Sequence, residues 1–406
     1  MFAEHRPEVA AVQAQLAQFM RDRVMPLEAK IMSDWHAGVH GWARGPEFDA
    51  LKAEAKAAGL WNFFMPSEFD GPALTVTEYA GLCEMMGRVQ FASELFNCNA
   101  PDTGNMELLE KFGTDAQKKD WLHPLLEGEI RSTFAMTEPD VASSDATNIS
   151  TTIFCDGDDY VINGRKWWAS GAASDICKLL IVLGRSNPEA DRHHQHSMVL
   201  VPKDHPGVTI VRQLTLMGYD DRPHGHCEIL FENVRVPAGN LLGGEGEGFS
   251  MSQARLGPGR VHHCMRMIGV AERAIEAMCS RASTRIAFGK PLARNEAVMQ
   301  AIARCRIEVE QARLLVLKTS WMIDTVGAKA ALSEIAAIKA LVPEMTQRVV
   351  ERALHVHGAG GLTEDFFLAY AFARSRALRF ADGPDDVHLS TVARLELKRQ
   401  VADVAG

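Results

Sequence analysis

No two cysteines of this 406-residue chain show the C-x-x-C spacing typical of zinc ligands and redox-active thiols. The three histidines of RHHQHS (192–197) lie in a polar stretch that offers little support for a metal. A disulfide framework is not expected in so long a chain. We therefore expect no metal and small buried thiols in a reducing compartment, at Cys83, Cys98, Cys155, Cys177, Cys227, Cys264, Cys279 and Cys305.

Long apolar runs and an excess of positive charge are also missing. No run of 18 apolar residues occurs, so we expect no membrane span. The formal net charge is -9, which excludes a broad basic field for nucleic acid or anionic membrane. The first twenty residues carry acidic side chains and lack the apolar segment of a signal peptide. We expect a cytoplasmic location, with neither nucleic acid nor membrane as a partner.

A glycine-rich dinucleotide motif is absent as well. GGEGEG (243–248) is a glycine-rich turn whose two glutamates would repel phosphate, and it does not open a helix after a strand in the required pattern. A Rossmann interpretation therefore fails. With 47% apolar and 23% charged residues, the chain is long enough for two or three globular domains.

Residues 1–131 are predicted to be helical. Apolar residues recur at spacings of three and four over 7–32, and a second such stretch ends near Gly59. Thr75 and Glu78 have the spacing of a capping box at the start of another helix.

Residues 132–243 show the two-residue alternation of β-strands. Asp156-Gly157 and Asn163-Gly164 are typical hairpin turns, and short β-rich runs follow them. Helices do not alternate with these strands, so the pattern predicts an antiparallel barrel or sandwich.

Residues 244–406 return to helical periodicity. Three helices over 249–283, 295–324 and 329–358, each longer than average, are joined by short loops and predict a bundle. Pro343 is expected to kink the third helix.

Two segments beside the predicted strands could bind a ligand. FAMTEPDVASSDATN (134–148) supplies hydroxyl groups for a polar heterocycle or a phosphate-like group, or it is a capped loop between domains. In KWWASG (166–171), alternation would place one tryptophan in the core. Trp168 would then be free to stack on a flat ligand, with Ser170 facing the same way.

Three further segments lie in the helical region. RIAFGKPL (285–292) could meet a phosphate and an aromatic ring, or be a solvated basic loop. HVHGAGG (355–361) could cap a helix or admit phosphates close to its backbone. RFADGPDDVHLS (379–390) gathers three carboxylates that, taken alone, are typical of a solvated turn.

Taken in order, these segments resemble the acyl-CoA dehydrogenase flavoproteins over essentially the whole chain. The resemblance is greatest to the subgroup formed by acyl-CoA dehydrogenase family members ten and eleven. It is carried by six motifs: MTEP…SSD, WWASG, LMGYDDRPHGH (216–226), RLGPGRVHHCMR (255–266), RIAFGKPL and LRFADGPDDVHL (378–389). Any one motif is weak, but six in register are specific.

The resemblance implies an α+β multidomain fold. Its parts would be an N-terminal helical domain (1–131), a middle antiparallel β-barrel (132–243) and a C-terminal four-helix bundle (244–406). It also implies FAD, with Arg285, Phe288 and residues 355–359 reaching the FAD of a neighbouring subunit. The implied cofactor-binding residues are Phe134, Met136, Thr137, Ser143, Ser144, Trp168, Ala169, Ser170, Arg285, Phe288, His355, Val356, His357, Gly358, Ala359, Pro384, Asp385 and Asp386. The implied substrate-binding residues are Ser144, Gly257, Pro258, Gly259, Arg260 and Gly383.

The implied reaction is α,β-dehydrogenation of an acyl-CoA, with electrons passed to an electron-transfer flavoprotein. It needs a base for the α-proton, and most relatives place Glu followed by Gly where this chain has Asp382-Gly383. A minority carries the base at the position of Gly259, which cannot serve. Asp382 is therefore the predicted catalytic base, while Asp385 and Asp386 are expected to be structural or near the adenosine of FAD.

The sequence departs from the family pattern at Asn295 and Glu296, where relatives usually keep a glutamine near FAD. Three alternatives stay open. An acyl-CoA oxidase would use oxygen as electron acceptor. A nitroalkane-oxidase-like enzyme would pair the aspartate with an arginine seven residues later, where this chain has Leu389. A flavin-binding assembly protein would have lost catalysis. A homodimer or homotetramer is expected, and the acyl chain is not determined.

Overall fold

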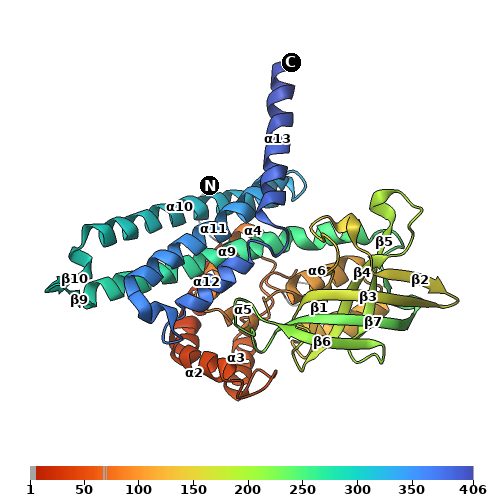
Figure 1. The fold of residues 1–406 in the computed structure, drawn as a ribbon, viewed down its shortest axis with the longest axis horizontal. Coiled ribbons are helices and arrows are strands. Elements are labelled where there is room, and N and C mark those ends of the chain that lie inside the picture. The colour runs from red at the N-terminus through yellow and green to blue at the C-terminus, as the bar shows by residue number, and fades with distance from the viewer. Residues whose placement is uncertain (1–5, 67–68, 70, 406) are drawn as a thin grey trace.

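The computed structural model describes residues 6–66, 69 and 71–405, except for the side chains of Pro258 and residues 402–405. Helices from both ends of the chain pack together on one side of the molecule, and a single large sheet forms the other side (Figure 1). Within the described residues, no helix is both long enough and apolar enough to cross a bilayer.

The N-terminal region is helical, as predicted. The capping box at Thr75 is confirmed, since its hydroxyl accepts from Glu78 N while the Glu78 carboxylate accepts from Thr75 N. A π-helical turn joins the first two helices, and Gly59 follows the third at φ +72°. The helices are α1 (Pro7–Phe19), α2 (Met25–His36), α3 (Pro46–Ala57), α4 (Val76–Gly87), α5 (Ala92–Leu95), α6 (Asp102–Phe112), α7 (Asp115–Gln117) and α8 (His123–Leu126).

The middle region forms one eight-stranded sheet in the order β6-β7-β3-β2-β4-β5-β8, with β1 paired to β4. Most neighbours are antiparallel, but β1 and β2 both pair parallel to β4, so the expectation of purely antiparallel pairing is wrong at those two places. The strands are β1 (Arg131–Ala135), β2 (Thr152–Asp156), β3 (Asp159–Ser170), β4 (Cys177–Arg185), β5 (His196–Pro202), β6 (Val208–Leu214), β7 (His226–Pro237) and β8 (Leu241–Leu242).

One predicted turn is confirmed and one is wrong. Asp156-Gly157 lies at the β2–β3 hairpin, as expected. Asn163-Gly164 instead lies within β3, at a register shift against β7. A Cβ on Gly164 would lie 2.4 Å from Thr151 Oγ1, so this glycine permits close approach of a neighbouring segment.

The three long C-terminal helices are confirmed as α9 (Gly248–Thr284), α10 (Glu296–Val326) and α11 (Leu332–His357). A short hairpin of β9 (Ile286–Ala287) and β10 (Lys290–Pro291) joins α9 to α10. Then follow α12 (Leu368–Ala377) and α13 (Asp385–Ala405). Pro343 lies inside α11, and its kink stays a prediction.

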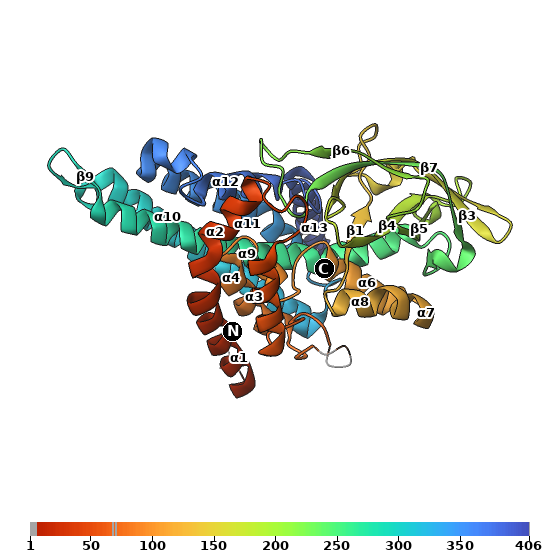
Figure 2. The same cartoon turned by 90° about the horizontal axis from the view of Figure 1, so that it is seen from below.

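Helix α9 connects the two halves of the molecule. It packs against α4, α10 and α11 within the helical part and reaches α6 and β5 at the sheet (Figure 2). Its buried Val261, Cys264 and Ile268 belong to a core shared with α4 and α11. Because α9 contacts both parts, residues near its first turns lie where the sheet and the bundle meet.

Candidate active site

The turn that carries Asp382 connects α12 to α13. Helix α12 ends at Ala377, and Gly383-Pro384 immediately precedes α13. Asp382 has φ +57° and Gly383 φ +108°. A Cβ on Gly383 would lie 2.9 Å from His388 Nε2, so both backbone conformation and space require glycine there. An aspartate tolerates positive φ better than most residues do.

Side chains from three helices hold this turn by its carbonyl groups. Arg260 Nε donates to the Asp382 carbonyl at 3.0 Å, and His388 Nε2 lies 3.2 Å from the same oxygen. The buried Lys339 Nζ donates to the carbonyl of Leu378 at 2.6 Å. The backbone contacts leave the Asp382 carboxylate free to face another partner.

That carboxylate faces α9. A Cβ placed on Gly259 would lie 3.2 Å from Asp382 Oδ2, and His263 Nε2 lies 3.6 Å from the same oxygen. Positions 259 and 263 are one helical turn apart and therefore share a face of α9. The two sequence positions considered for the catalytic base thus meet at one place, and Asp382 is the only carboxylate of that pair.

His263 is a neighbour of the carboxylate that sequence reasoning missed. Arg266 Nη2 lies 3.1 Å from His263 Nδ1, and a guanidinium can only donate, so the imidazole hydrogen is on Nε2, toward Asp382. Burial, together with the positive charge of Arg266, holds the pKa of His263 well below its usual range. Gly259, His263 and Arg266 are spaced by four and three residues, so a helix places them on one face. That spacing was the sequence signal that could have identified His263 as a neighbour of the base.

The other two acids of the turn have different surroundings. Asp385 Oδ2 accepts from Arg379 Nε at 2.6 Å, an ion pair that closes the turn, while Asp386 is exposed. Pro384 is half-buried between them and Asp382.

On the sheet side, the regular alternation expected for the two tryptophans is wrong. The β3–β7 register shifts between Lys166 and Ala169, and Trp168 has φ +50°. As a result Trp167 is half-buried rather than in the core, and Trp168 is 39% exposed. Ala169 is buried and Ser170 is half-buried beside the exposed indole. The bulge therefore presents an aromatic plane and a hydroxyl together.

The 134–148 loop is fixed by a buried ion pair that sequence reasoning missed. Glu138 accepts from Ser150 N, Thr151 N and Lys166 Nζ, each at 2.8–2.9 Å. Burial opposes its ionisation, but Lys166 and the hydroxyl donors outweigh burial and lower the pKa of Glu138 to about 2. This ion pair attaches the loop to Lys166, the residue that precedes Trp167 and Trp168.

The predicted ligand residues of that loop are partly engaged within it. Ser143 Oγ accepts from Glu138 N at 2.9 Å, whereas Ser144 is exposed. Backbone carbonyls of Met136 and Thr137 accept from Lys166 Nζ and Trp167 N, each at 2.9 Å. The half-buried Phe134 ring lies 4.2 Å from the guanidinium carbon of Arg255.

A cavity of about 110 Å³ opens between α4, α6, α9 and α10. Apolar side chains line most of it, with Gly257, Glu107 and His262 among its walls. Glu107 Oε2 and His262 Nδ1 are buried without a hydrogen-bond partner among the described residues. Burial raises the pKa of Glu107 to about 8 and lowers that of His262 to about 3, so both are neutral at pH 7. Nothing described lies within 4 Å of a Cβ on Gly257.

The remaining predicted cofactor residues are not brought to Asp382. Arg285 is exposed, and Phe288, fully exposed at φ +53°, is at the β9–β10 hairpin, at the far end of α9 and α10 from the sheet (Figure 1). Residues 355–359 are at that same end, because Phe366 contacts both His357 and Arg281 of α9.

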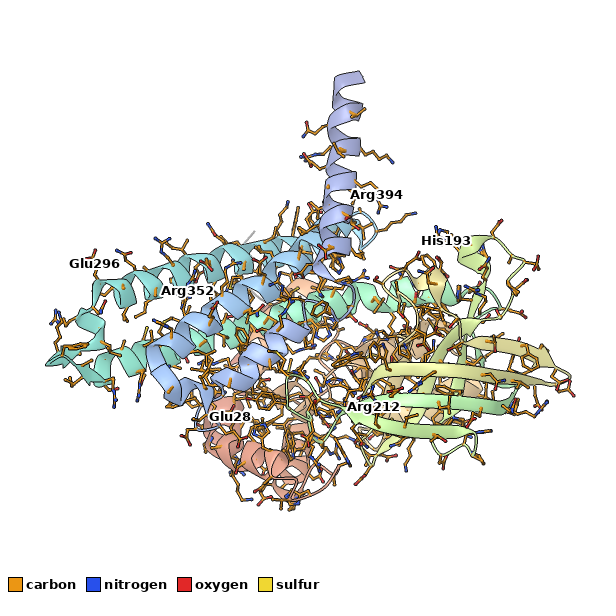
Figure 3. All side chains as sticks on the ribbon, viewed as in Figure 1. Glu28, His193, Arg212, Glu296, Arg352 and Arg394 are labelled. Atoms are coloured by element: carbon orange, nitrogen blue, oxygen red, sulfur yellow. The ribbon has the colours of Figure 1, made fainter. Side chains whose placement is uncertain are left out.

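Within 355–359, the side chains of Val356 and His357 are buried, so His355, Gly358 and Ala359 are the exposed members. Asn295, one of the two positions expected to depart from the family pattern, caps α10 by accepting from Ala297 N at 2.9 Å. Glu296 begins α10 at the same end of the bundle (Figure 3).

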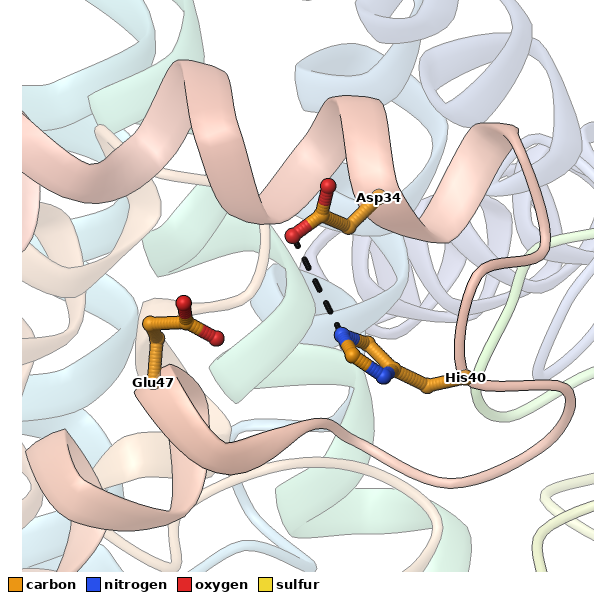
Figure 4. A group of neighbouring side chains, drawn as sticks. All are labelled: Asp34, His40 and Glu47. Atoms are coloured by element: carbon orange, nitrogen blue, oxygen red, sulfur yellow. Dashed lines mark ion pairs between the residues drawn. The ribbon is translucent and has the colours of Figure 1, made fainter.

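One group of metal-ligand type occurs among the described residues, formed by Asp34, His40 and Glu47 (Figure 4). The ammonium of Lys30 pairs with Asp34 Oδ2 at 2.8 Å and with Glu47 Oε1 at 2.6 Å. Because a cation of the protein already pairs with both carboxylates, this cluster carries no argument for a metal.

Comparison with known proteins covers nearly the whole chain. The sequence profiles described as "Acyl-CoA dehydrogenase, N-terminal domain", "Acyl-CoA dehydrogenase, middle domain" and "Acyl-CoA dehydrogenase, C-terminal domain" match residues 6–129, 133–234 and 246–397. "Probable acyl-CoA dehydrogenase FadE2" of Mycobacterium tuberculosis is 54% identical over 96% of this chain and 96% of its own length.

Mammalian relatives are longer. "Acyl-CoA dehydrogenase family member 10" of Mus musculus is 52% identical over 97% of this chain but only 37% of its own length. "Acyl-CoA dehydrogenase family member 11" of Homo sapiens is 50% identical over 95% of this chain and 50% of its own length. The chain therefore spans about half or less of these two relatives.

Solved structures share the fold. A protein of Mycobacterium abscessus classed as an acyl-CoA dehydrogenase matches with a TM-score of 0.95 and 50% identity, over 98% of this chain and 100% of that one. Butyryl-CoA dehydrogenase from Megasphaera elsdenii matches with a TM-score of 0.82 over 98% of this chain and 100% of that one, at 22% identity, which supports the fold alone.

Proposed function

The chain belongs to the acyl-CoA dehydrogenase family of flavin-dependent oxidoreductases, and from this premise we propose that it oxidises the Cα–Cβ bond of an acyl-CoA to the trans-2-enoyl-CoA. The observation that carries the proposal is the convergence of Asp382 with Gly259, where the two family positions for the base meet and one carboxylate is present. Electron transfer to an electron-transfer flavoprotein and a role in fatty-acid β-oxidation are part of the proposal.

The residues at the sheet fit the FAD that the family requires. The exposed indole of Trp168 offers a stacking plane, with the Ser170 hydroxyl beside it. The 134–148 loop adds the free hydroxyl group of Ser144. Arg285 and Phe288 add a cation and a fully exposed ring at the other end of the bundle. These groups suit a flat heterocycle and a diphosphate.

In the proposed reaction, Asp382 Oδ2 accepts the α-proton of the acyl-CoA. When bound, FAD supplies the acceptor for the hydrogen that leaves the β-carbon with its electron pair. His263 cannot take the proton from Asp382, because its Nε2 already bears a hydrogen and its Nδ1 faces Arg266. The proton therefore stays on Asp382 until product leaves.

We assign the acyl chain to the cavity lined by Gly257, Glu107 and His262. Its walls are mostly apolar and its two titratable groups are neutral at pH 7, so a hydrocarbon chain can enter without displacing water from a charge. Gly257 in the cavity wall lies two residues before Gly259, the position that Asp382 Oδ2 faces, which relates the cavity to the base.

The function is tested by adding acyl-CoAs of different length and branching to the purified protein without oxygen. The flavin absorbance should bleach with at least one of them, because α,β-dehydrogenation reduces the flavin stoichiometrically. Slow recovery of colour in air would support the dehydrogenase, and fast recovery would support the acyl-CoA oxidase. Absence of bleaching with every acyl-CoA would favour the non-catalytic flavin-binding protein.

The purified protein should be yellow and hold one non-covalent FAD per chain. The reason is that the aromatic plane and hydroxyl groups at the sheet suit the flavin ring, while Arg285 of a neighbouring copy would meet the diphosphate and adenosine part that FMN lacks. Release by heat followed by chromatography identifies and counts the flavin. Stoichiometric FMN, or no flavin after reconstitution with FAD, would contradict the prediction.

The protein should form a homodimer or homotetramer. Arg285 and Phe288 lie away from Asp382, so another copy must bring them to the flavin that Asp382 uses. Helix α13, on which Arg394 is marked in Figure 3, projects from the body and exposes one apolar stripe, made of Leu389, Ala393, Leu397 and Val401. Burying this stripe against a second copy would stabilise the assembly.

Light scattering should therefore give a multiple of the 44.6 kDa chain mass. Leu397→Glu should weaken the assembly by placing a charge in the stripe, whereas Lys398→Glu beside it should have a smaller effect. A monomeric mass for a protein with full flavin occupancy would rule the prediction out.

A further inference from the structure

Three side chains beside the exposed indole of Trp168 form a hydrogen-bonded row: Ser170, His226 and Asp221. Ser170 and His226 are direct partners across the β3–β7 ladder, so their side chains share one face of the sheet. Ser170 Oγ lies 2.8 Å from His226 Nδ1, and His226 Nε2 lies 3.0 Å from Asp221 Oδ2. The mechanism proposed above makes no use of His226 or Asp221.

Asp221 is a fixed, charged end of this row. Its carboxylate is buried and accepts hydrogen bonds from the Tyr370 hydroxyl and the Arg374 guanidinium, both on α12. Burial opposes ionisation, but Arg374, His226 and Tyr370 outweigh it and hold the pKa of Asp221 well below its usual range. Its carbonyl accepts from Gly225 N at 2.9 Å, which also fixes the backbone.

The charged end sets the direction of both hydrogen bonds. An ionised carboxylate can only accept, so His226 Nε2 carries a hydrogen and donates it to Asp221. In the neutral imidazole, Nδ1 is then an acceptor, and the Ser170 hydroxyl donates to it at 2.8 Å in preference to the Trp168 carbonyl, which is 3.4 Å away. The hydrogen of Ser170 therefore points into the protein, and its oxygen lone pairs point away from His226.

The other end of the row reaches the predicted cofactor surface. Ser170 is half-buried beside the exposed indole of Trp168, and the His226 ring lies 5.2 Å from that indole, centroid to centroid. His226 thus contacts both side chains assigned to the flavin. A change at His226 would therefore alter the Ser170 hydroxyl through the hydrogen bond that joins the two side chains.

We infer that His226 is a positioning residue that makes Ser170 a hydrogen-bond acceptor toward the edge of the bound FAD. This inference rests on the proposed function. An acceptor stabilises the two-electron-reduced flavin, which carries an additional N–H at that edge, relative to the oxidised flavin, which offers only a lone pair there. The row Asp221–His226–Ser170 thereby raises the reduction potential of the bound cofactor.

The test compares His226→Phe, Ser170→Ala, the double variant and His226→Asn. Phenylalanine keeps a ring beside Trp168 but has no nitrogen for Ser170. Asparagine can place its amide oxygen near the former Nδ1 and so can still accept from Ser170. For each protein, the midpoint potential of bound FAD and the dissociation constant of oxidised FAD from the apoprotein are measured.

His226→Phe and Ser170→Ala should each disfavour reduced over oxidised FAD by about tenfold, the effect of one hydrogen bond, which is about 30 mV for a two-electron couple. The double variant should show no larger shift than either single variant, because both changes break one interaction. His226→Asn should stay near the wild-type potential.

Unchanged potentials in Ser170→Ala and His226→Phe, or additive shifts in the double variant, would overturn the inference. If His226→Phe does not fold, His226→Leu takes its place, since leucine also lacks an acceptor for Ser170: it should shift the potential as Ser170→Ala does, while His226→Asn should not. Failure of the proposed function is distinguishable, because it would appear as no bleaching of the wild-type flavin by any acyl-CoA, whereas the potential is measured with a chemical reductant and needs no acyl-CoA.

Discussion

Asp382→Asn should abolish flavin reduction by acyl-CoA while leaving FAD bound. General-base catalysis commonly contributes about 10²–10⁴-fold to a rate. The other family position for the base is Gly259 in this chain, so no carboxylate there can replace Asp382. Asparagine keeps the shape of the side chain, and the Arg260 and His388 contacts go to the backbone carbonyl of residue 382, so the turn should stay folded. Anaerobic stopped-flow absorbance measures the rate of bleaching.

The matched control is Asp385→Asn on the same turn. Its carboxylate pairs with Arg379, so this variant should lose some stability but should lose much less of the flavin-reduction rate than Asp382→Asn.

Asp382→Glu tests the position of the base more finely. Oδ2 already lies near the Gly259 face of α9, so the longer side chain must shift its carboxylate. A displacement of about an ångström can cost about 10²-fold. Wild-type bleaching rates in Asp382→Asn would eliminate Asp382 as the base.

Arg131→Met should destabilise the protein by about 3–5 kcal/mol, the range typical of removing one partner of a buried ion pair. Arg131 is buried, and its guanidinium donates to Glu94 Oε2 at 2.8 Å and to Asp102 Oδ2 at 2.7 Å. The Asp102 carboxylate also accepts from Ser132 N at 2.7 Å, which joins α6 to β1. Without the guanidinium, two buried carboxylates would lose their principal cation.

Urea unfolding of the FAD-loaded protein at pH 7 measures this loss. Arg235→Met is the control, because Arg235 also lies on a strand and pairs with two acids, Asp156 and Asp159, but is 49% exposed. Exposed pairs are screened by solvent, so its effect should be much smaller. Equal losses in the two variants would contradict the argument from burial.

The effect of Arg131→Met should depend on pH. Burial opposes ionisation of Glu94, but Arg131 and His224 outweigh it and hold the pKa of Glu94 well below its usual range. The stability from this ionised group is complete above the glutamate pKa of the unfolded chain, about 4.3. It is lost as the pH falls below that value toward the folded-state pKa. The difference between wild type and variant should therefore shrink on acidification.

Local features were predictable because their causes are local. The capping box of Thr75 and Glu78 depends on residues three apart, and the Asp156-Gly157 hairpin on two turn residues. The helices α9, α10 and α11 follow from apolar spacing within each segment. The family, and with it Asp382 as the candidate base, followed from six motifs in register along the chain.

The sequence by itself therefore determined the order of elements, the family and the residue most suited to be the base. The tertiary structure decided what depends on distant segments. It made Asn163-Gly164 a point of close approach to Thr151, paired β1 parallel to β4, and exposed Trp168 through a bulge. It also brought His263 to Asp382 and Asp221 to His226. Most of these contacts join residues from 13 to 119 positions apart, so no local pattern encodes them. Asp221 and His226 are only five apart, but α12 holds the Asp221 carboxylate and the β3–β7 ladder holds His226, so packing of the whole chain also sets their contact.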